Sequence, residues 1–251
     1  RMPHRDGLSL LKEIRERSPE TPVIMITAFQ DLENTVAAMH NGAVDCVPKP
    51  IDIEELEAVV DRAIRLRDGG ATDGFVVDHN EPADMIVGRS RPMQDIFKTI
   101  GMVSQSRVTV LILGESGTGK ELVARAIHMA SVDAEEPFVA VNCAALVETL
   151  LESEMFGHER GSFTGAVGDR KGKAEIAGDG TLFLDEVSEL SLRMQGKILR
   201  LLEEREFTPV GGARTMISRA RFIAATNADI EERVADGHFR EDLFYRLNVV
   251  S

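Results

Sequence analysis

The chain has 251 residues, of which 43% are hydrophobic and 28% are charged, a balance typical of a globular protein rather than a disordered one. Its formal net charge of −13 argues against broad electrostatic attraction to DNA or to an anionic membrane, because such binding needs clustered Lys and Arg. No apolar run approaches the ~20 residues that span a bilayer, and no signal-peptide pattern opens the chain. Cys46 and Cys143 lack metal-ligand or disulfide spacing, which predicts two packing residues in a reduced, cytoplasmic protein.

Residues 1–67 have the pattern of an α/β unit with a parallel sheet. Apolar residues at helical spacing alternate here with short apolar runs that end at turn residues. The predicted elements are a helix over 8–17, a strand over 22–28 that is buried on both faces, a helix from a cap at Asp31 to Asn41, a strand over 44–47, and a helix from a cap at Asp52 to about Arg67.

Residues 68–83 mix Gly, Asp and Pro with little periodicity, which predicts a linker. A second α/β unit follows over 84–251. Its predicted elements are a helix from a cap at Ser90 to Ser104, a buried strand over 108–113, a helix over 119–130, strands over 138–141, 181–184 and 220–225, and helices around 145–155, 191–204 and 229–236.

The run GESGTGKE follows the strand predicted over 108–113 and opens the next helix, which is the context that a phosphate-binding loop requires. Its glycines let backbone N–H groups converge on phosphate oxygens, and the helix N-terminus adds partial positive charge. Lys120 would reach the terminal phosphates, whereas Glu121 stands where Ser or Thr usually holds magnesium, so the metal needs other ligands. A simple glycine turn is the alternative. The predicted nucleotide-binding residues are Gly114, Glu115, Ser116, Gly117, Thr118, Gly119, Lys120 and Glu121.

The run TLFLDE is an apolar strand that ends in two acids. Asp185 can hold magnesium, in our interpretation through water, and Glu186 can polarise the attacking water. Capping of the next helix is the alternative role of this acid pair. Beside a phosphate loop, the pair favours an ATP site.

Phosphoryl transfer also needs positive charge near the γ-phosphate, which a neighbouring subunit can supply. Arg240 and Arg246 lie on a predicted helical stretch and are candidates for this role. The alternatives are a solvated helix face and an ordinary ion pair with Glu241 or Asp242.

Taken in order, these motifs resemble the AAA+ ATPase domain of the sigma-54-dependent transcriptional activators, the bacterial enhancer-binding proteins of the nitrogen-regulator type. MIVGRS, with Val87 and Gly88, resembles the segment that borders the adenine. GESGTGKE is that family's own form of the phosphate loop, glutamate included. REFTPVGG over 205–212 matches the second pore loop, and Asn227 in AATN matches the sensor position.

Two further roles follow from the same resemblance. Asn142 in FVAVNCAAL is implied to hold Glu186 inactive until remodelling is triggered, and a buried strand-end amide is the alternative. Arg240 and Arg246 match the two trans-acting arginines of the family.

The run GSFTGA consists of Gly161, Ser162, Phe163, Thr164, Gly165 and Ala166. Taken alone, it predicts a tight turn with Phe163 folded onto the core, since glycines usually serve turns. It also resembles the family signature GAFTGA, with Ser162 in place of alanine. That resemblance implies an exposed loop that grips the sigma-54 factor and moves on its two glycines.

Residues 1–67 resemble the second half of a two-component receiver domain, through RMPHRDG, the ITA that contains Thr27 and the VPKP that contains Lys49. The resemblance implies a flavodoxin-like sheet in which Thr27 and Lys49 contact a phosphorylated aspartate. That aspartate would precede Arg1, and Cys46 replaces a common aromatic residue. We therefore expect a fragment of a longer protein, whose residues 1–67 cannot be switched by phosphate.

The implied architecture is an α/β chain with a partial receiver domain followed by a P-loop AAA+ domain. The implied function is hydrolysis of ATP with Mg²⁺ in a hexameric ring that remodels the sigma-54 RNA polymerase at a closed promoter. A sensor histidine kinase would be a partner, no membrane would be, and enhancer DNA would be bound through a helix-turn-helix domain beyond Ser251. One alternative is a nucleotide-dependent assembly module without productive hydrolysis. Another is a general protein-unfolding AAA+ enzyme, although the FTGA loop argues against it.

Overall fold

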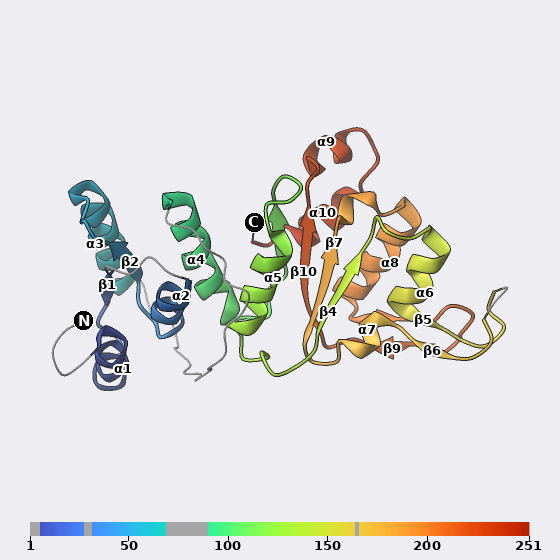
Figure 1. Cartoon of the computed structure of the whole chain (residues 1–251), viewed down its shortest axis with the longest axis horizontal. Coiled ribbons are helices and arrows are strands. Elements are labelled where there is room, and N and C mark those ends of the chain that lie inside the picture. Colours follow the sequence, from blue (N-terminus) through green and yellow to red (C-terminus); the bar gives the residue numbers. More distant parts are fainter. Residues whose placement is uncertain (1–5, 28–31, 69–89, 164–165, 251) are drawn as a thin grey trace. The chain divides into compact units, whose positions relative to one another are not determined.

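The computed structural model describes residues 6–27, 32–68, 90–163 and 166–250, which form two compact units (Figure 1). The first unit comprises the chain up to Ser106 together with Ala130–Val132, and the second comprises Arg107–Met129 with Asp133–Ser251. Both units contain parallel strands and helices, as the sequence pattern predicts. The cap predicted at Asp31 and all of the predicted linker after Asp68 lie outside the described residues.

The first unit consists of helices and one strand pair: α1 (Gly7–Arg17), β1 (Ile24–Thr27), α2 (Leu32–His40), β2 (Asp45–Pro48), α3 (Ile53–Asp68) and α4 (Arg91–Ser104). Helix α1 begins after Asp6, whose carboxylate caps the helix by accepting a hydrogen bond from the N–H of Ser9 at 2.7 Å. Strands β1 and β2 pair in parallel, with Ile24 opposite Asp45.

The prediction that strand β1 is buried on both faces is wrong. The side chain of Ile26 is 43% exposed, and the other residues of β1 are only half-buried. In the described part of the chain, β1 pairs with β2 alone, and the small core around Leu11 and Met39 covers only part of its surface. A continuous apolar run indicates full burial only when neighbouring strands and helices cover both faces.

Helix α4 packs closely on helix α2 within the first unit. A Cβ atom on Gly101 would come within 2.6 Å of the Met39 Cβ, so glycine permits this close approach. The side chains of Lys98 and Asp45 form a buried ion pair at 2.7 Å. Ser90 occupies the N-cap position as predicted, but its side chain makes no capping hydrogen bond.

The second unit is built on a parallel four-stranded sheet with the order β3–β10–β7–β4. Helix α5 covers one face, and helices α6 and α8 cover the other (Figure 1). Its elements are β3 (Val110–Leu113), α5 (Lys120–Met129), β4 (Phe138–Asn142), α6 (Glu148–Phe156), β5 (Gly157–His158), β6 (Arg170–Lys171), α7 (Lys173–Ile176), β7 (Thr181–Asp185), the 3-10 helix η1 (Val187–Glu189), α8 (Leu192–Glu203), β8 (Glu206–Phe207), β9 (Met216–Ile217), β10 (Arg221–Thr226), α9 (Ile230–Ala235) and α10 (Glu241–Leu247).

The main core of the second unit lies between the sheet and helices α6 to α10. The central strands β7 and β10 are almost completely buried, whereas β3 is an edge strand whose Leu113 is 56% exposed. The prediction of a buried strand over 108–113 therefore holds only for its middle, at Val110 and Leu111. The free thiols Cys46 and Cys143 are both buried, as expected of packing residues.

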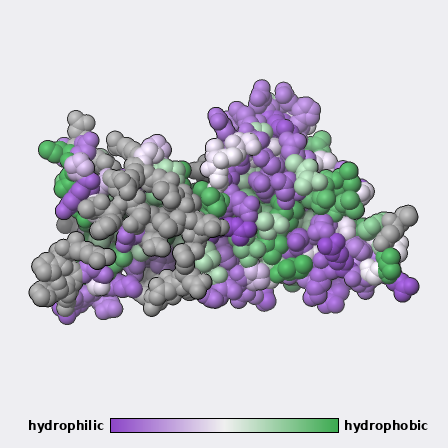
Figure 2. Space-filling view, viewed as in Figure 1, coloured by the Kyte–Doolittle hydropathy of each residue, from purple (hydrophilic) through white to green (hydrophobic). Residues whose placement is uncertain are grey.

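The surface of the second unit is mainly hydrophilic. Figure 2 shows hydrophilic residues over much of this face, with hydrophobic residues in smaller groups between them. Across the described ranges, every helix is too short or too polar to span a membrane. Because all four strands of the sheet run in parallel, their carboxyl ends meet at one edge, which is where such sheets usually bind ligands.

Candidate nucleotide-binding and catalytic site

The loop between β3 and α5 is compact and depends on glycine. Gly117 and Gly119 have φ values of +79° and +87°, in the left-handed region that glycine enters without steric cost. The Thr118 hydroxyl donates a hydrogen bond to the Glu115 carbonyl at 2.8 Å. Directly after the loop, the ten-residue helix α5 begins at Lys120, so its N-terminal N–H groups and their partial positive charge face the loop.

Lys120 is buried and folds back over the loop. Its Nζ donates hydrogen bonds to the carbonyl oxygens of Gly114 and Glu115, at 2.9 and 3.1 Å. The loop is also joined to strand β10, because the N–H of Gly114 donates to the Thr226 carbonyl at 3.3 Å. The lysine is therefore held at the edge of the sheet where the strands β3, β7 and β10 end.

Glu121 takes no part in this cluster. Its carboxylate forms an exposed ion pair with Arg125, one turn further along α5, at 2.6 Å. Arg125 in turn lies over the ring of Phe138, 4.6 Å from its centroid.

The acid pair follows strand β7. Asp185 ends the strand and accepts a hydrogen bond from the N–H of Glu186 at 3.0 Å. Burial, and next the negative charge of Glu186, raise the pKa of Asp185 above its ordinary value. A bound cation would relieve this unfavourable charge. In the described part of the chain, no group of three or more His, Cys, Asp or Glu side chains is arranged to hold a metal.

Asn142 ends the neighbouring strand β4, opposite Asp185 in the register. Its Nδ2 donates a hydrogen bond to Asp185 Oδ2 at 3.4 Å, and its Oδ1 accepts one from the N–H of Ala144 at 2.9 Å. The side chain is exposed rather than buried. In this structure the amide thus contacts the first acid of the pair, whereas the family resemblance implies contact with the second, Glu186.

Glu186 is held by the end of strand β10. Its Oε2 accepts a hydrogen bond from the backbone N–H of Asn227 at 3.3 Å. The backbone of Glu186 is left-handed, with φ +53° and ψ +49°, a conformation that costs energy for a residue with a side chain. The structure thus joins the predicted catalytic acid to the predicted sensor residue, a contact that the sequence does not indicate.

The two candidate arginines belong to helix α10 and its N-cap. Arg240 is its N-cap residue and forms an exposed ion pair with Asp242 at 2.6 Å, which is one of the alternatives left open by the sequence. Arg246 Nη2 donates to the Leu202 carbonyl at 3.5 Å. These contacts link both arginines to their own helix and its neighbour rather than to the acid pair.

The segment Gly161–Ala166 forms a tight loop, of which Thr164 and Gly165 lie outside the described residues. The N–H of Gly161 donates to the Ala166 carbonyl at 2.9 Å, which closes the loop. Phe163 is 36% exposed, and its ring meets the His158 ring edge-on at 5.0 Å. Phe163 is thus only partly covered, whereas the six residues taken alone predict that it folds onto the core.

The base of this loop is joined to the segment 205–212. The N–H of Glu159 donates to the Val210 carbonyl at 3.0 Å, and the N–H of Val210 donates to the Gly157 carbonyl at 2.9 Å. A Cβ on Gly211 would lie 2.4 Å from the Ser162 Cβ, so only glycine fits beside the serine. The base of the predicted sigma-54 loop and the predicted second pore loop therefore lie side by side.

In the first unit, Thr27 and Lys49 lie at the carboxyl ends of the paired strands β1 and β2, where the N–H of Lys49 donates to the Thr27 carbonyl at 2.7 Å. The structure thus brings the two predicted receiver residues together. Val87 and Gly88, predicted to border the adenine, lie outside the described residues.

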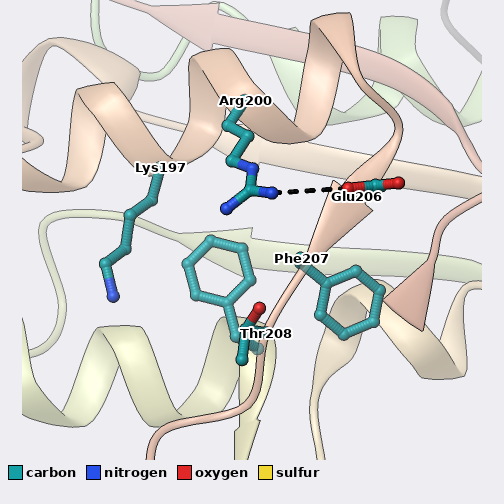
Figure 3. Close-up of a pocket in the computed structure, with 6 residues that line it drawn as sticks. Lys197, Arg200, Glu206, Phe207 and Thr208 are labelled. Atoms are coloured by element: carbon teal, nitrogen blue, oxygen red, sulfur yellow. Dashed lines mark hydrogen bonds and ion pairs between the residues drawn. The ribbon is translucent and has the colours of Figure 1, made fainter. Parts of the chain in front are cut away.

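A small cavity beside helix α8 is lined by Phe156, Lys197 and Arg200, together with Glu206, Phe207 and Thr208 of the predicted second pore loop (Figure 3). Both Lys197 and Arg200 project from helix α8, and Arg200 points toward Glu206 (Figure 3). Both cations are paired, Lys197 with Glu152 and Arg200 with Glu206 at 3.3 Å. These two positive charges are therefore already neutralised by neighbouring carboxylates.

Comparison with known proteins agrees with this geometry. The family described as the sigma-54 interaction domain matches residues 86–251, and the response regulator receiver domain matches residues 1–61. The chain therefore belongs to the sigma-54 interaction domain family, with a receiver segment before it. The predicted fold class and family are confirmed.

Among individual proteins, the chain is 50% identical over 250 residues to the DNA-binding transcriptional regulator NtrC of Escherichia coli (strain K12), covering 100% of this chain and 53% of that protein. It is 49% identical over 257 residues to the regulatory protein AtoC of the same strain, covering 100% and 55%. The crystal structure of NtrX from Brucella abortus in complex with ATP matches with a TM-score of 0.60 and 38% identity, covering 97% and 55%. The chain spans about half the length of the curated relatives it matches.

Proposed function

We propose that this chain binds ATP and Mg²⁺, hydrolyses the ATP and uses the energy to remodel RNA polymerase that carries the sigma-54 factor. The observation that carries this proposal is the convergence of Lys120, the acid pair and Asn227 at one edge of the parallel sheet. The alternative is a nucleotide-dependent assembly module, which would need the phosphate loop but no catalytic glutamate.

Nucleotide binding is assigned to the loop from Gly114 to Glu121. Lys120 would exchange its bonds to the Gly114 and Glu115 carbonyls for bonds to the terminal phosphates, while the N–H groups at the start of α5 bind the other phosphate oxygens. Val87 and Gly88 would border the adenine. The solved ATP complex of NtrX, a protein with 38% identity to this chain, supports this assignment.

Hydrolysis is assigned to Glu186. Its carboxylate would polarise a water molecule that attacks the γ-phosphorus, so that the bond to the β-phosphate oxygen breaks and ADP and phosphate leave. Bound at Asp185, Mg²⁺ would supply positive charge to the phosphate oxygens. Asn142, which contacts Asp185, and Asn227, which contacts Glu186, would report the state of the γ-phosphate to the rest of the domain.

A second copy of the chain would complete the site in a ring, which we propose is a hexamer. Arg240 is exposed, and opening its ion pair with Asp242 would free the guanidinium for the γ-phosphate of a neighbouring subunit. Arg246 would act beside it. An exposed ion pair of this kind contributes little to stability, so nucleotide contacts can replace it.

Contact with sigma-54 is assigned to the loop of residues 161–166. Gly161 has a φ of +81° and nothing within 4 Å of the place where a Cβ would lie, so the loop can move at this end without steric hindrance. Phe163 is already partly exposed and would make the contact together with Thr164. The hydrogen bonds to segment 205–212 would transmit movement from the core.

We also propose that residues 1–67 are the later part of a receiver domain, joined by a linker over 68–83 to the ATPase domain over 84–251. Thr27 and Lys49 would serve a phosphorylation site whose donor is a sensor histidine kinase. The pairing of both residues at one end of the β1–β2 sheet supports this role.

The substitution Glu186→Gln tests the proposed function. It keeps the size of the side chain but removes the charge that polarises water, so we expect ATP turnover to fall about 10²-fold or more while nucleotide binding persists. Steady-state phosphate release and calorimetric ATP binding would measure the two effects. An unaltered turnover rate would refute the assignment, and a wild-type protein that assembles with ATP but releases no phosphate would favour the assembly module.

A further inference from the structure

Two buried hydroxyl groups bridge the segments that carry Glu186 and Asn227. Ser188, in the 3-10 helix η1, is 1% exposed, and Thr226, the last residue of strand β10, is 0% exposed. Their hydroxyl oxygens lie 2.9 Å apart, with Thr226 donating to Ser188. Ser188 follows Glu186 by two residues and Thr226 directly precedes Asn227, so this bond lies immediately behind the Glu186–Asn227 contact.

The bridge belongs to a continuous chain of hydrogen bonds. The N–H of Ala228 donates to the Thr226 hydroxyl at 3.1 Å, and the Ser188 hydroxyl donates onward to the Glu189 carboxylate at 3.4 Å. Each hydroxyl therefore both donates and accepts, as buried hydroxyl groups must to avoid an energetic penalty. Replacing either one would leave its partner with an unmade bond in a buried site.

Helix α9 holds the same turn from another side. Arg233 donates from Nη1 to the Ser188 carbonyl and from Nη2 to the Glu189 carboxylate, both at 2.8 Å. The turn therefore has hydrogen bonds to strand β10 and to helix α9. Such support is needed because Glu186, which directly precedes η1, has a left-handed backbone. This conformation is unfavourable for a residue with a side chain.

Thr226 also connects this turn to the phosphate loop. Its carbonyl accepts the hydrogen bond from the N–H of Gly114, while its hydroxyl donates to Ser188. The buried Thr226 thus connects the phosphate loop with the turn that follows the proposed catalytic acid, and it directly precedes the proposed sensor residue. A small shift at the Ser188–Thr226 bond would change the position of Glu186 relative to the nucleotide.

We propose that Ser188 is a positioning residue for ATP hydrolysis: through Thr226, its hydroxyl fixes the Glu186 carboxylate against the backbone of Asn227. Ser188 is buried and bonded to Thr226 and Glu189, and it would act only through its neighbours. The inference rests on the proposed ATPase function and extends it to a residue for which the sequence motifs give no role.

The substitution Ser188→Ala tests the inference, since it removes the hydroxyl and little volume. We expect kcat for ATP hydrolysis to fall about tenfold, with KM and the calorimetric Kd for ATP within about twofold of the wild-type values, because misplacement of a reacting group acts on the chemical step. Ser104→Ala is the matched control. Ser104 is also buried, and its hydroxyl donates to the Gly101 carbonyl in the first unit, far from this chemistry in the sequence.

A double-mutant cycle separates positioning from a general loss of structure. Thr226→Val removes the other hydroxyl, and the double variant with Ser188→Ala should lose no more than the more affected single variant, because the two hydroxyls make one bond. Thr226→Ser keeps the hydroxyl and should recover most of the rate. In a Glu186→Gln background, Ser188→Ala should cause no further loss.

Three results would overturn the inference: an unchanged kcat in Ser188→Ala, a rise in KM that accounts for the whole loss, or independent losses that multiply in the double variant. If Glu186→Gln itself leaves turnover intact, the proposed function fails and this inference fails with it. If Glu186→Gln abolishes turnover and Ser188→Ala does not alter kcat, only the positioning role is refuted.

Discussion

The backbone N–H of Asn227 donates a hydrogen bond to the carboxylate of Glu186 at 3.3 Å, and this contact joins the ends of strands β10 and β7. It holds the proposed catalytic acid beside the proposed sensor residue. Because Asn142 contacts Asp185 at the same edge of the sheet, both acids of the pair have a partner on a different strand. The predictions below follow from this arrangement and from the contacts around it.

Removing the Lys120 ammonium should weaken ATP binding. We expect Lys120→Ala to raise the calorimetric Kd for ATP at least about tenfold, since a charge-assisted bond to phosphate contributes roughly 1.5–3 kcal/mol. Lys171→Ala is a suitable control, because Lys171 is an exposed lysine paired with Glu175. An unaltered Kd for Lys120→Ala would contradict the position of the phosphate site.

Substitutions in the loop of residues 161–166 should impair the contact with sigma-54 without impairing ATP hydrolysis. We expect Phe163→Ala to keep ATP turnover within about twofold but to abolish transcription from a sigma-54 promoter, because the ring lies on the loop and not among the catalytic groups. Thr164→Ala should behave in the same way. The exposed Val167, just outside the loop, supplies the control Val167→Ala. Parallel loss of both activities would count against a separate contact loop.

Asp185 should make stability depend on pH. Its pKa is raised in the folded protein, first by burial and then by Glu186, so the fold favours the protonated form. The stability that this group contributes is complete below its unfolded pKa of about 4 and is lost as the pH rises through the higher folded value. Asp185→Asn should therefore increase the free energy of unfolding at about pH 7, and the gain should shrink at about pH 3.5. Urea denaturation at both pH values would measure the free energy of unfolding of the two proteins. An equal gain at both pH values would show that the gain does not come from the raised pKa of Asp185.

Bound Mg²⁺ should reverse the stability advantage of the Asp185→Asn variant. With Mg²⁺ and ATP present, the wild-type protein should gain more stability than Asp185→Asn, because only the carboxylate attracts the cation. Thermal denaturation with and without both ligands would measure the difference. Equal stabilisation of the two proteins would argue against Asp185 as the metal-binding residue.

The buried ion pair between Lys98 and Asp45 should be important for the first unit. Lys98→Met removes the ammonium from a buried carboxylate and should cost about 3 kcal/mol of unfolding free energy. Arg17→Met breaks an exposed pair with Glu13 on helix α1 and should cost about 0.3 kcal/mol. Urea denaturation followed by circular dichroism would compare the two variants. Similar small costs would show that the α2–α4 contact does not depend on this pair.

The sequence by itself determined the features that depend on neighbouring residues. GESGTGKE required a strand before it and a helix after it, and both are present as β3 and α5. The acids of TLFLDE end strand β7, as the apolar run predicts. Such motifs are readable because glycine torsions, helix starts and strand ends are set within a few residues.

Only the tertiary structure decided which of these groups meet. The Ser188–Thr226 bond joins residues 38 apart in the chain, and the Glu186–Asn227 contact joins residues 41 apart. The exposure of Ile26 could not be predicted from the sequence either, because burial depends on which strands and helices cover the apolar run. The order of the parallel strands, which no local pattern encodes, places β10 between β3 and β7 and so brings the phosphate loop, the acid pair and the sensor residue to one edge.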